Sequence, residues 1–81
     1  MIMIDVMIPV TGEVSDFFVR DDLAVGEVKK EVLKLIKAKN PHYCIKKDEL
    51  SFYAYFREQL LDEGMSFMEQ GVGNGEKLIL I

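Results

Sequence analysis

Only a few residues of this 81-residue chain combine a reactive side chain with a spacing that suits catalysis. His42 and Cys44 stand two positions apart, and a histidine beside a cysteine can activate the thiolate as a nucleophile. The sequence shows no third group to orient the histidine and no oxyanion-hole pattern, and the segment around the pair predicts no fixed geometry. We therefore interpret Cys44 as a partly buried structural thiol, and we predict no catalytic residue and no enzymatic activity.

Three acidic pairs offer oxygen ligands for a metal or carboxyl groups for acid–base catalysis. They are Asp21-Asp22, Asp48-Glu49 and Asp62-Glu63, and each adjoins a predicted turn or helix start. Acids are expected there because they cap helices and favour turns. A single cysteine and a single histidine also argue against a zinc site, so we predict no metal ion.

The glycine-rich segment Gly71–Gly75 has the superficial composition of a phosphate-binding loop. Such a loop leads into a helix and carries a lysine. This segment instead precedes a predicted strand and has no lysine at the required place. We interpret it as a turn and predict no cofactor.

Alternating apolar and polar residues predict the strands that would position any site. In the first strand, Ile2 to Pro9, the isoleucine parity should face the core because Asp5 belongs to the other parity. A strand at 14–20 returns as a hairpin, with Phe17 and Val19 inward, and a strand at 50–56 should bury Phe56. Shorter elements follow: a strand at 60–61, a helix at 66–71 that begins with a Ser66–Glu69 capping box and ends at Gly71, and a strand at 78–81.

One longer helix is predicted from Val25 to Lys39, ended by Asn40-Pro41. Ala24, the residue before it, is a poor N-cap because it has no side-chain acceptor. The core-facing stripe of this helix is expected to hold Val25, Val28, Val32, Leu35 and Ile36.

The order of these elements predicts an α+β fold. A hairpin, a crossing helix and a last strand beside the first define the β-grasp, or ubiquitin-like, architecture, with a mixed sheet of four to five strands packed on one main helix. At this length residues 1–81 should form a single domain. No apolar run approaches the ~20 residues of a membrane span, and the first residues lack a basic signal region, so we expect a cytoplasmic protein without direct membrane insertion.

Strand parity predicts a protein-binding surface on the sheet face that the helix leaves uncovered. Apolar, tyrosine and methionine side chains gathered on one face are typical of such surfaces. Homodimerisation, or ordinary exposed apolar residues in a small domain, would account for the same pattern. The predicted partner surface consists of Met3, Met7, Phe18, Tyr53, Tyr55, Ile79 and Ile81.

The net charge of −4 is unevenly distributed along the chain. Residues 29–47 hold seven bases against one acid, while residues 1–28 hold six acids against one base. One face of the predicted helix is basic and holds Lys30, Lys34 and Lys37. We interpret it as a face exposed to solvent, and a binding site for an acidic protein partner is the alternative. The face has neither arginine nor interleaved aromatic residues, so we expect no nucleic acid partner.

Several segments carry a resemblance to known families. Residues 61–72, followed by 78–81, resemble the C-terminal third of ubiquitin without a gap. The whole chain resembles more closely the YukD/EsaB group of small bacterial ubiquitin-like proteins, although Ala24 stands where relatives often have a capping threonine. The features that carry this second resemblance are Ile4–Pro9, Ser15-Asp16-Phe17, Val25-Gly26-Glu27-Val28, and Gly71–Gly75 leading into Leu78-Ile79-Leu80.

The YukD/EsaB resemblance implies an accessory protein of type VII secretion in Gram-positive bacteria, whose partner is the membrane-bound secretion ATPase or another subunit of the machinery. A carrier or modifier that works with an adenylating enzyme is the alternative, and so is a generic β-grasp binding module. Carriers and modifiers need a tail that ends in Gly-Gly, whereas this sequence ends in Leu80-Ile81 within a predicted strand. We therefore expect a non-enzymatic adaptor that acts by protein–protein recognition.

Overall fold

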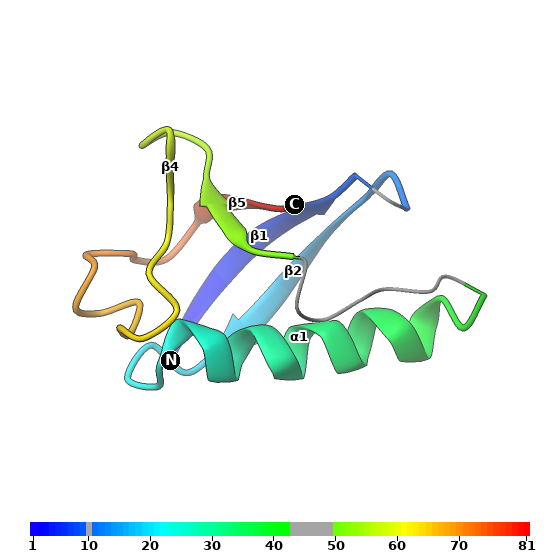
Figure 1. Ribbon diagram of the computed structural model, residues 1–81, viewed down its shortest axis with the longest axis horizontal. Coiled ribbons are helices and arrows are strands. Elements are labelled where there is room, and N and C mark those ends of the chain that lie inside the picture. Colours follow the sequence, from blue (N-terminus) through cyan, green and yellow to red (C-terminus); the bar gives the residue numbers. More distant parts are fainter. Residues whose placement is uncertain (10, 43–49) are drawn as a thin grey trace.

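One mixed sheet and one long helix make up the fold, seen in a computed structural model that describes residues 1–9, 11–42 and 50–81 (Figure 1). The sheet order is β2-β1-β5-β3-β4; β1 and β5 run parallel, and all other neighbours are antiparallel. α1 crosses one face of this sheet, so the predicted β-grasp fold is confirmed. The elements are β1 (Ile2–Ile8), β2 (Glu13–Val19), α1 (Val25–Lys39), β3 (Phe52–Ala54), β4 (Gln59–Leu60) and β5 (Glu76–Leu80).

The core lies between α1 and the sheet face that it covers. Along β1 the isoleucine parity is buried and the Met3 parity is not, as the alternation predicts. β5 lies centrally, with Leu78 and Leu80 buried against α1. In β2 the inward residues are the buried Val19 and the half-buried Phe17.

The buried stripe of α1 differs from the prediction at two positions. Val25, Val28, Val32 and Ile36 are buried as expected, but Leu35 is 59% exposed, and Lys29 and Leu33 are buried instead. At 100° per residue, Leu33 and Leu35 lie on opposite flanks of the stripe. The fold covers only the Leu33 flank, which the helical period alone cannot reveal.

Lys29 is the buried cation that the sequence pattern missed. Its ammonium group donates hydrogen bonds to the Glu63 carboxylate and, at 2.9 Å, to the carbonyl oxygen of Leu50. The Lys29 side chain is only 9% exposed, whereas that of Glu63 is 43% exposed. The pair therefore ties the second turn of α1 to the loop after β4.

The same loop also caps α1, which explains how the helix begins without a capping side chain at Ala24. The amide of Val25 donates to the carbonyl of Met65 at 2.8 Å, and that of Gly26 donates to the carbonyl of Glu63 at 3.0 Å. Carbonyls distant in sequence thus satisfy the free donors of the first turn. A Cβ at Gly26 would lie 3.3 Å from the Glu63 carbonyl oxygen, so the close approach favours glycine.

The predicted helix at 66–71 does not form, because this segment makes hydrogen-bonded turns instead. Its capping box forms, since the Ser66 hydroxyl accepts from the Glu69 amide and the Glu69 carboxylate accepts from the Ser66 amide, both at 3.0 Å. Gly71, with φ +74°, then reverses the chain, and the amide of Val72 donates to the carbonyl of Phe67 at 2.8 Å. This left-handed residue keeps the turn from continuing as a helix, and the buried Phe67 packs on Phe52.

β3 is shorter than the predicted strand at 50–56. The amide of Glu58 donates to the carbonyl of Ala54 at 2.9 Å, so the chain turns directly after Ala54. Phe56 therefore lies in a turn and is 70% exposed, not buried. Its ring packs edge-on against Tyr55 with the centroids 5.3 Å apart.

Some sequence predictions lie outside the described residues, namely those for Cys44 and for Asp48-Glu49. Within the described part of the chain, no helix is long and apolar enough to cross a membrane.

The Lys29–Glu63 pair should contribute measurably to the free energy of unfolding. We expect Glu63→Gln to lower it by about 1–2 kcal/mol, because a buried ammonium loses its counter-charge. Adding Lys29→Met should recover most of that loss by removing the buried charge. Urea unfolding of each variant measures both effects.

The exposed pair between Lys34 and Glu31, 3.7 Å apart, supplies the control. Glu31→Gln should change stability by less than about 0.5 kcal/mol. Equal losses in Glu31→Gln and Glu63→Gln would show that burial of Lys29 does not strengthen its ion pair.

Candidate protein-binding surface

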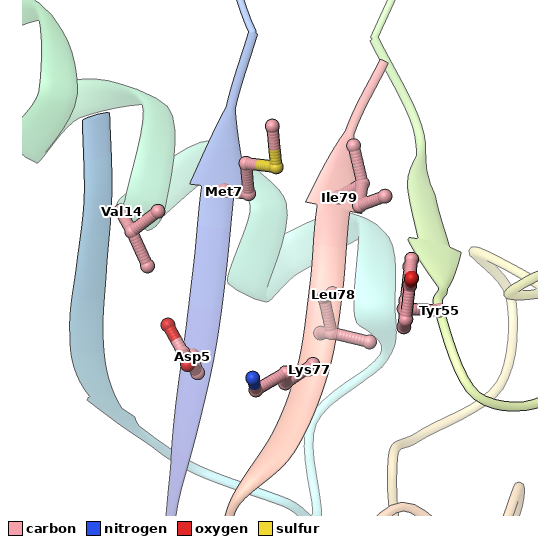
Figure 2. Close-up of a pocket in the computed structure, with 7 residues that line it drawn as sticks. All are labelled: Asp5, Met7, Val14, Tyr55, Lys77, Leu78 and Ile79. Carbon is pink, nitrogen blue, oxygen red and sulfur yellow. The ribbon is translucent and has the colours of Figure 1, made fainter. Parts of the chain in front are cut away.

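The sheet face away from α1, here called the outer face, carries all seven residues of the predicted partner surface. The strands place five of them there because their alternate neighbours are buried against α1, while Tyr55 and Ile81 directly follow the ends of β3 and β5. Tyr53 and Ile79 are half-buried, and the other five are exposed. Figure 2 shows part of this face, with Met7 and Ile79 on neighbouring strands.

Cross-strand register joins some of these residues into one apolar row. Val14 lies opposite Met7, Met7 opposite Ile79, Ile79 opposite Tyr53, and Tyr53 opposite Leu60. The row therefore crosses all five strands of the sheet. Val14 and Leu60 were not among the predicted site residues; Val14 shares the parity of Phe18, and that signal could have found it.

A charged row lies beside the apolar row and interrupts the predicted set. Asp5 faces Asp16 on β2 and Lys77 on β5. The row separates the neighbouring pair of Met3 and Phe18 from the apolar row, so the structure does not bring all the predicted residues into one patch. Like charges directly opposite destabilise a strand pair, and Oδ1 of Asp5 is buried without a hydrogen-bond partner among the described residues.

A shallow depression of about 280 Å³ lies where the two rows meet. Figure 2 shows that its lining combines apolar side chains with one acid and one base. Such a depression can accept an apolar side chain of a partner, while the charges select its orientation. The lining residues are Asp5, Met7, Val14, Tyr55, Lys77, Leu78 and Ile79.

The predicted basic face lies elsewhere, on the exposed side of α1. Lys30 is 3.3 Å from the Glu27 carboxylate, and Lys34 is 3.7 Å from that of Glu31. Lys37 lies in the last turn, where a cation favours the helix dipole. Because α1 covers the opposite sheet face, these lysines do not join the outer face, and two of them already have acidic neighbours.

The loop after β2 holds the ion pair with the clearest effect on protonation. Arg20 donates two hydrogen bonds to Asp22, at 3.0 and 2.7 Å. These bonds hold the pKa of Asp22 below its usual value and raise the pKa of Arg20. Both groups are exposed to solvent, and the guanidinium of Arg20 is engaged locally.

No arrangement for metal chemistry occurs in residues 1–9, 11–42 and 50–81, where no three histidine, cysteine or acidic side chains gather closely enough to hold a metal ion. The outer face has three features that a partner could contact, namely the apolar row, the charged row and the depression where they meet. This arrangement suits recognition of another protein.

Comparison with known proteins identifies the fold. Neither a protein-family model nor a curated protein matches the sequence. Among solved structures, the ubiquitin of Caldiarchaeum subterraneum superposes with a TM-score of 0.76 and 21% identity, over 99% of this chain and 90% of that one. The N-terminal ubiquitin-like domain of the 4931431F19Rik protein gives 0.77 and 18%, over 99% and 72%. The fold is therefore ubiquitin-like.

The charged row should cost stability, which a substitution can measure. We expect Asp5→Val to raise the free energy of unfolding by about 1 kcal/mol, because it removes a buried unpaired oxygen and an opposed acid pair. Asp16→Val removes only the repulsion between the two acids and should therefore raise the free energy of unfolding by less. Guanidinium unfolding measures both variants, and a loss of stability in Asp5→Val would mean that attraction to Lys77 outweighs both costs.

Proposed function

We propose that this chain is a non-enzymatic, single-domain ubiquitin-like adaptor that recognises a protein partner through its outer face. The observation that carries the proposal is the apolar row, which runs across all five strands on the side that α1 leaves open. A sheet holds such a row in a fixed geometry, so its side chains need little ordering when a partner binds.

The side chains of the outer face suit a protein partner. Met7 supplies a flexible apolar chain that adapts to an opposing surface. Tyr53 and Tyr55 supply rings with a polar tip, which are enriched at interfaces. Asp5 and Lys77 give the surface one charge of each sign beside the row, so a partner can be held in one orientation.

We further propose that the adaptor serves a type VII secretion system as a cytoplasmic accessory protein. The resemblance to the YukD/EsaB group supports this, because the segments that carry it follow one another in the same order along nearly the whole chain. The features lie in the parts that build the fold: Ile4–Pro9 covers most of β1, and Val25–Val28 begins α1. The proposed partner is the cytosolic part of the membrane-bound secretion ATPase, or another subunit of that machinery.

A charge placed in the apolar row should weaken partner binding. Met7→Lys suits this test because Met7 is 44% exposed, and because the acids of the neighbouring row should tolerate a new cation. Binding to the purified cytosolic region of the secretion ATPase of the same genome, measured by calorimetry, should weaken about tenfold or more.

Met68→Lys is the matched control, since Met68 is an exposed methionine on the turn at 66–71, away from the row. Its affinity should stay within about twofold of the unmodified protein. Equal weakening by both substitutions would contradict the outer face as the docking surface. If the unmodified protein bound no subunit of the machinery, the secretion role would be wrong. A dimer that Met7→Lys dissociates would instead assign the face to self-association.

A further inference from the structure

A second apolar surface lies between β2 and α1, on the other side of the sheet edge from the outer face. Two cavities, of about 290 and 330 Å³, lie along this edge. Both are lined by Phe17 of β2 and Leu35 of α1, so they form one groove interrupted at those two side chains. Val32 contributes to the first cavity and Ile36 to the second.

Leu35 is the residue of this groove that the packing of the core leaves unexplained. The sequence pattern predicts it in the buried stripe, yet it is 59% exposed. It stands on the flank of α1 that no part of the described chain covers. An apolar side chain at the rim of two adjoining cavities can gain burial when an added segment fills them.

The backbone of β2 adds a second and independent feature. β2 is an edge of the sheet (Figure 1). In β1, the carbonyl of Met3 accepts from the Gly75 amide at 2.8 Å, and the amide of Met3 donates to the Asn74 side chain at 2.8 Å, so the Met3 parity of β1 directs its backbone groups toward β5.

It follows that the other parity of β1 bonds to β2. The residues of β2 opposite the Met3 parity, which are Val14, Asp16 and Phe18, therefore direct their amides and carbonyls away from β1, toward the open edge. No backbone hydrogen bond to these groups is present within the described ranges. Such an edge is a template for one more strand.

We propose that this groove binds an extended segment of a partner protein, which adds as a strand to the open edge of β2. The backbone groups of Val14, Asp16 and Phe18 would pair with the segment, as in other cases of strand addition. Side chains on one parity of the segment would enter the two cavities on either side of Leu35 and Phe17.

The charges along the edge define the sequence of the segment. Asp16 is the central one of the three edge residues, and it already faces Asp5 across the sheet. Arg20, near one end of the groove, is engaged with Asp22. A lysine or arginine opposite Asp16 would therefore relieve a repulsion, and its two sequence neighbours would point into the groove. The expected pattern is apolar, basic, apolar.

The same charges disfavour a second copy of this chain as the occupant. An antiparallel pairing of two β2 edges that is centred on Asp16 would place this carboxylate opposite its own copy. Like charges directly opposite destabilise a strand pair. A partner segment with a lysine or arginine opposite Asp16 would not meet this repulsion between like charges.

The test uses the acetylated and amidated peptide Thr-Ile-Lys-Val-Thr, titrated into the labelled protein by nuclear magnetic resonance. The amides of Val14, Asp16 and Phe18 should shift and become protected from hydrogen exchange. Replacing the central lysine of the peptide by glutamate should weaken binding about tenfold. Shifts centred on Ile79 instead, or no shift up to about 5 mM peptide, would overturn the proposal.

Two leucines of equal exposure provide matched variants, since Leu35 and Leu60 are both 59% exposed. Leu35→Gln should weaken peptide binding about tenfold, because one apolar contact to both incoming side chains is lost. Leu60→Gln, on the opposite edge, should leave it unchanged. Equal effects of the two, or a concentration-dependent doubling of mass in place of peptide binding, would overturn the proposal.

The outer-face variant Met7→Lys separates this proposal from the proposed function. Its substitution lies on the opposite side of the sheet from the groove, so peptide binding should persist. Loss of peptide binding in Met7→Lys would place the peptide on the outer face and overturn the groove as its site. Retained peptide binding, by contrast, is expected whether or not the adaptor proposal holds.

Discussion

The parallel pairing of β1 with β5 is the contact on which the rest of the molecule depends. It joins residues 4–7 to residues 76–79 at the centre of the sheet. Two parallel strands cannot be joined by a tight turn, so the chain between them must cross a sheet face, and α1 lies on that face. The crossing buries one face, leaves the outer face open, and places β2 at an edge. Both proposed binding surfaces are consequences of that arrangement.

The loop at 63–65 holds α1 in place on the sheet. Its carbonyls take the first free amides of the helix, while the Glu63 carboxylate reaches Lys29 one turn further along. A helix that begins at Ala24 without a capping side chain is unfavourable in isolation. Here the donors are satisfied by residues about 40 positions distant. The start of α1 is therefore a tertiary feature, and the helix begins there without a capping side chain at Ala24.

The two surfaces differ in what they offer a partner. The outer face presents side chains only, because the backbone groups of its central strands are used within the sheet. The β2 groove presents backbone donors and acceptors together with apolar cavities. The first suits a folded partner surface, and the second suits an extended segment. They lie on opposite sides of the sheet, which allows one partner to engage both or two partners to bind together.

Local patterns in the sequence were enough for the order of the strands and α1, the inward parity of β1, the capping box at Ser66 and the extent of α1. Each depends on residues within a few positions of one another, where the periods of strand and helix apply. Only the tertiary structure decided that Lys29 is buried, that Leu35 and Phe56 are exposed, and that Asp5 faces Asp16. These depend on strand register, on a turn and on which flank of the helix is covered, and those follow from contacts between residues far apart in the chain.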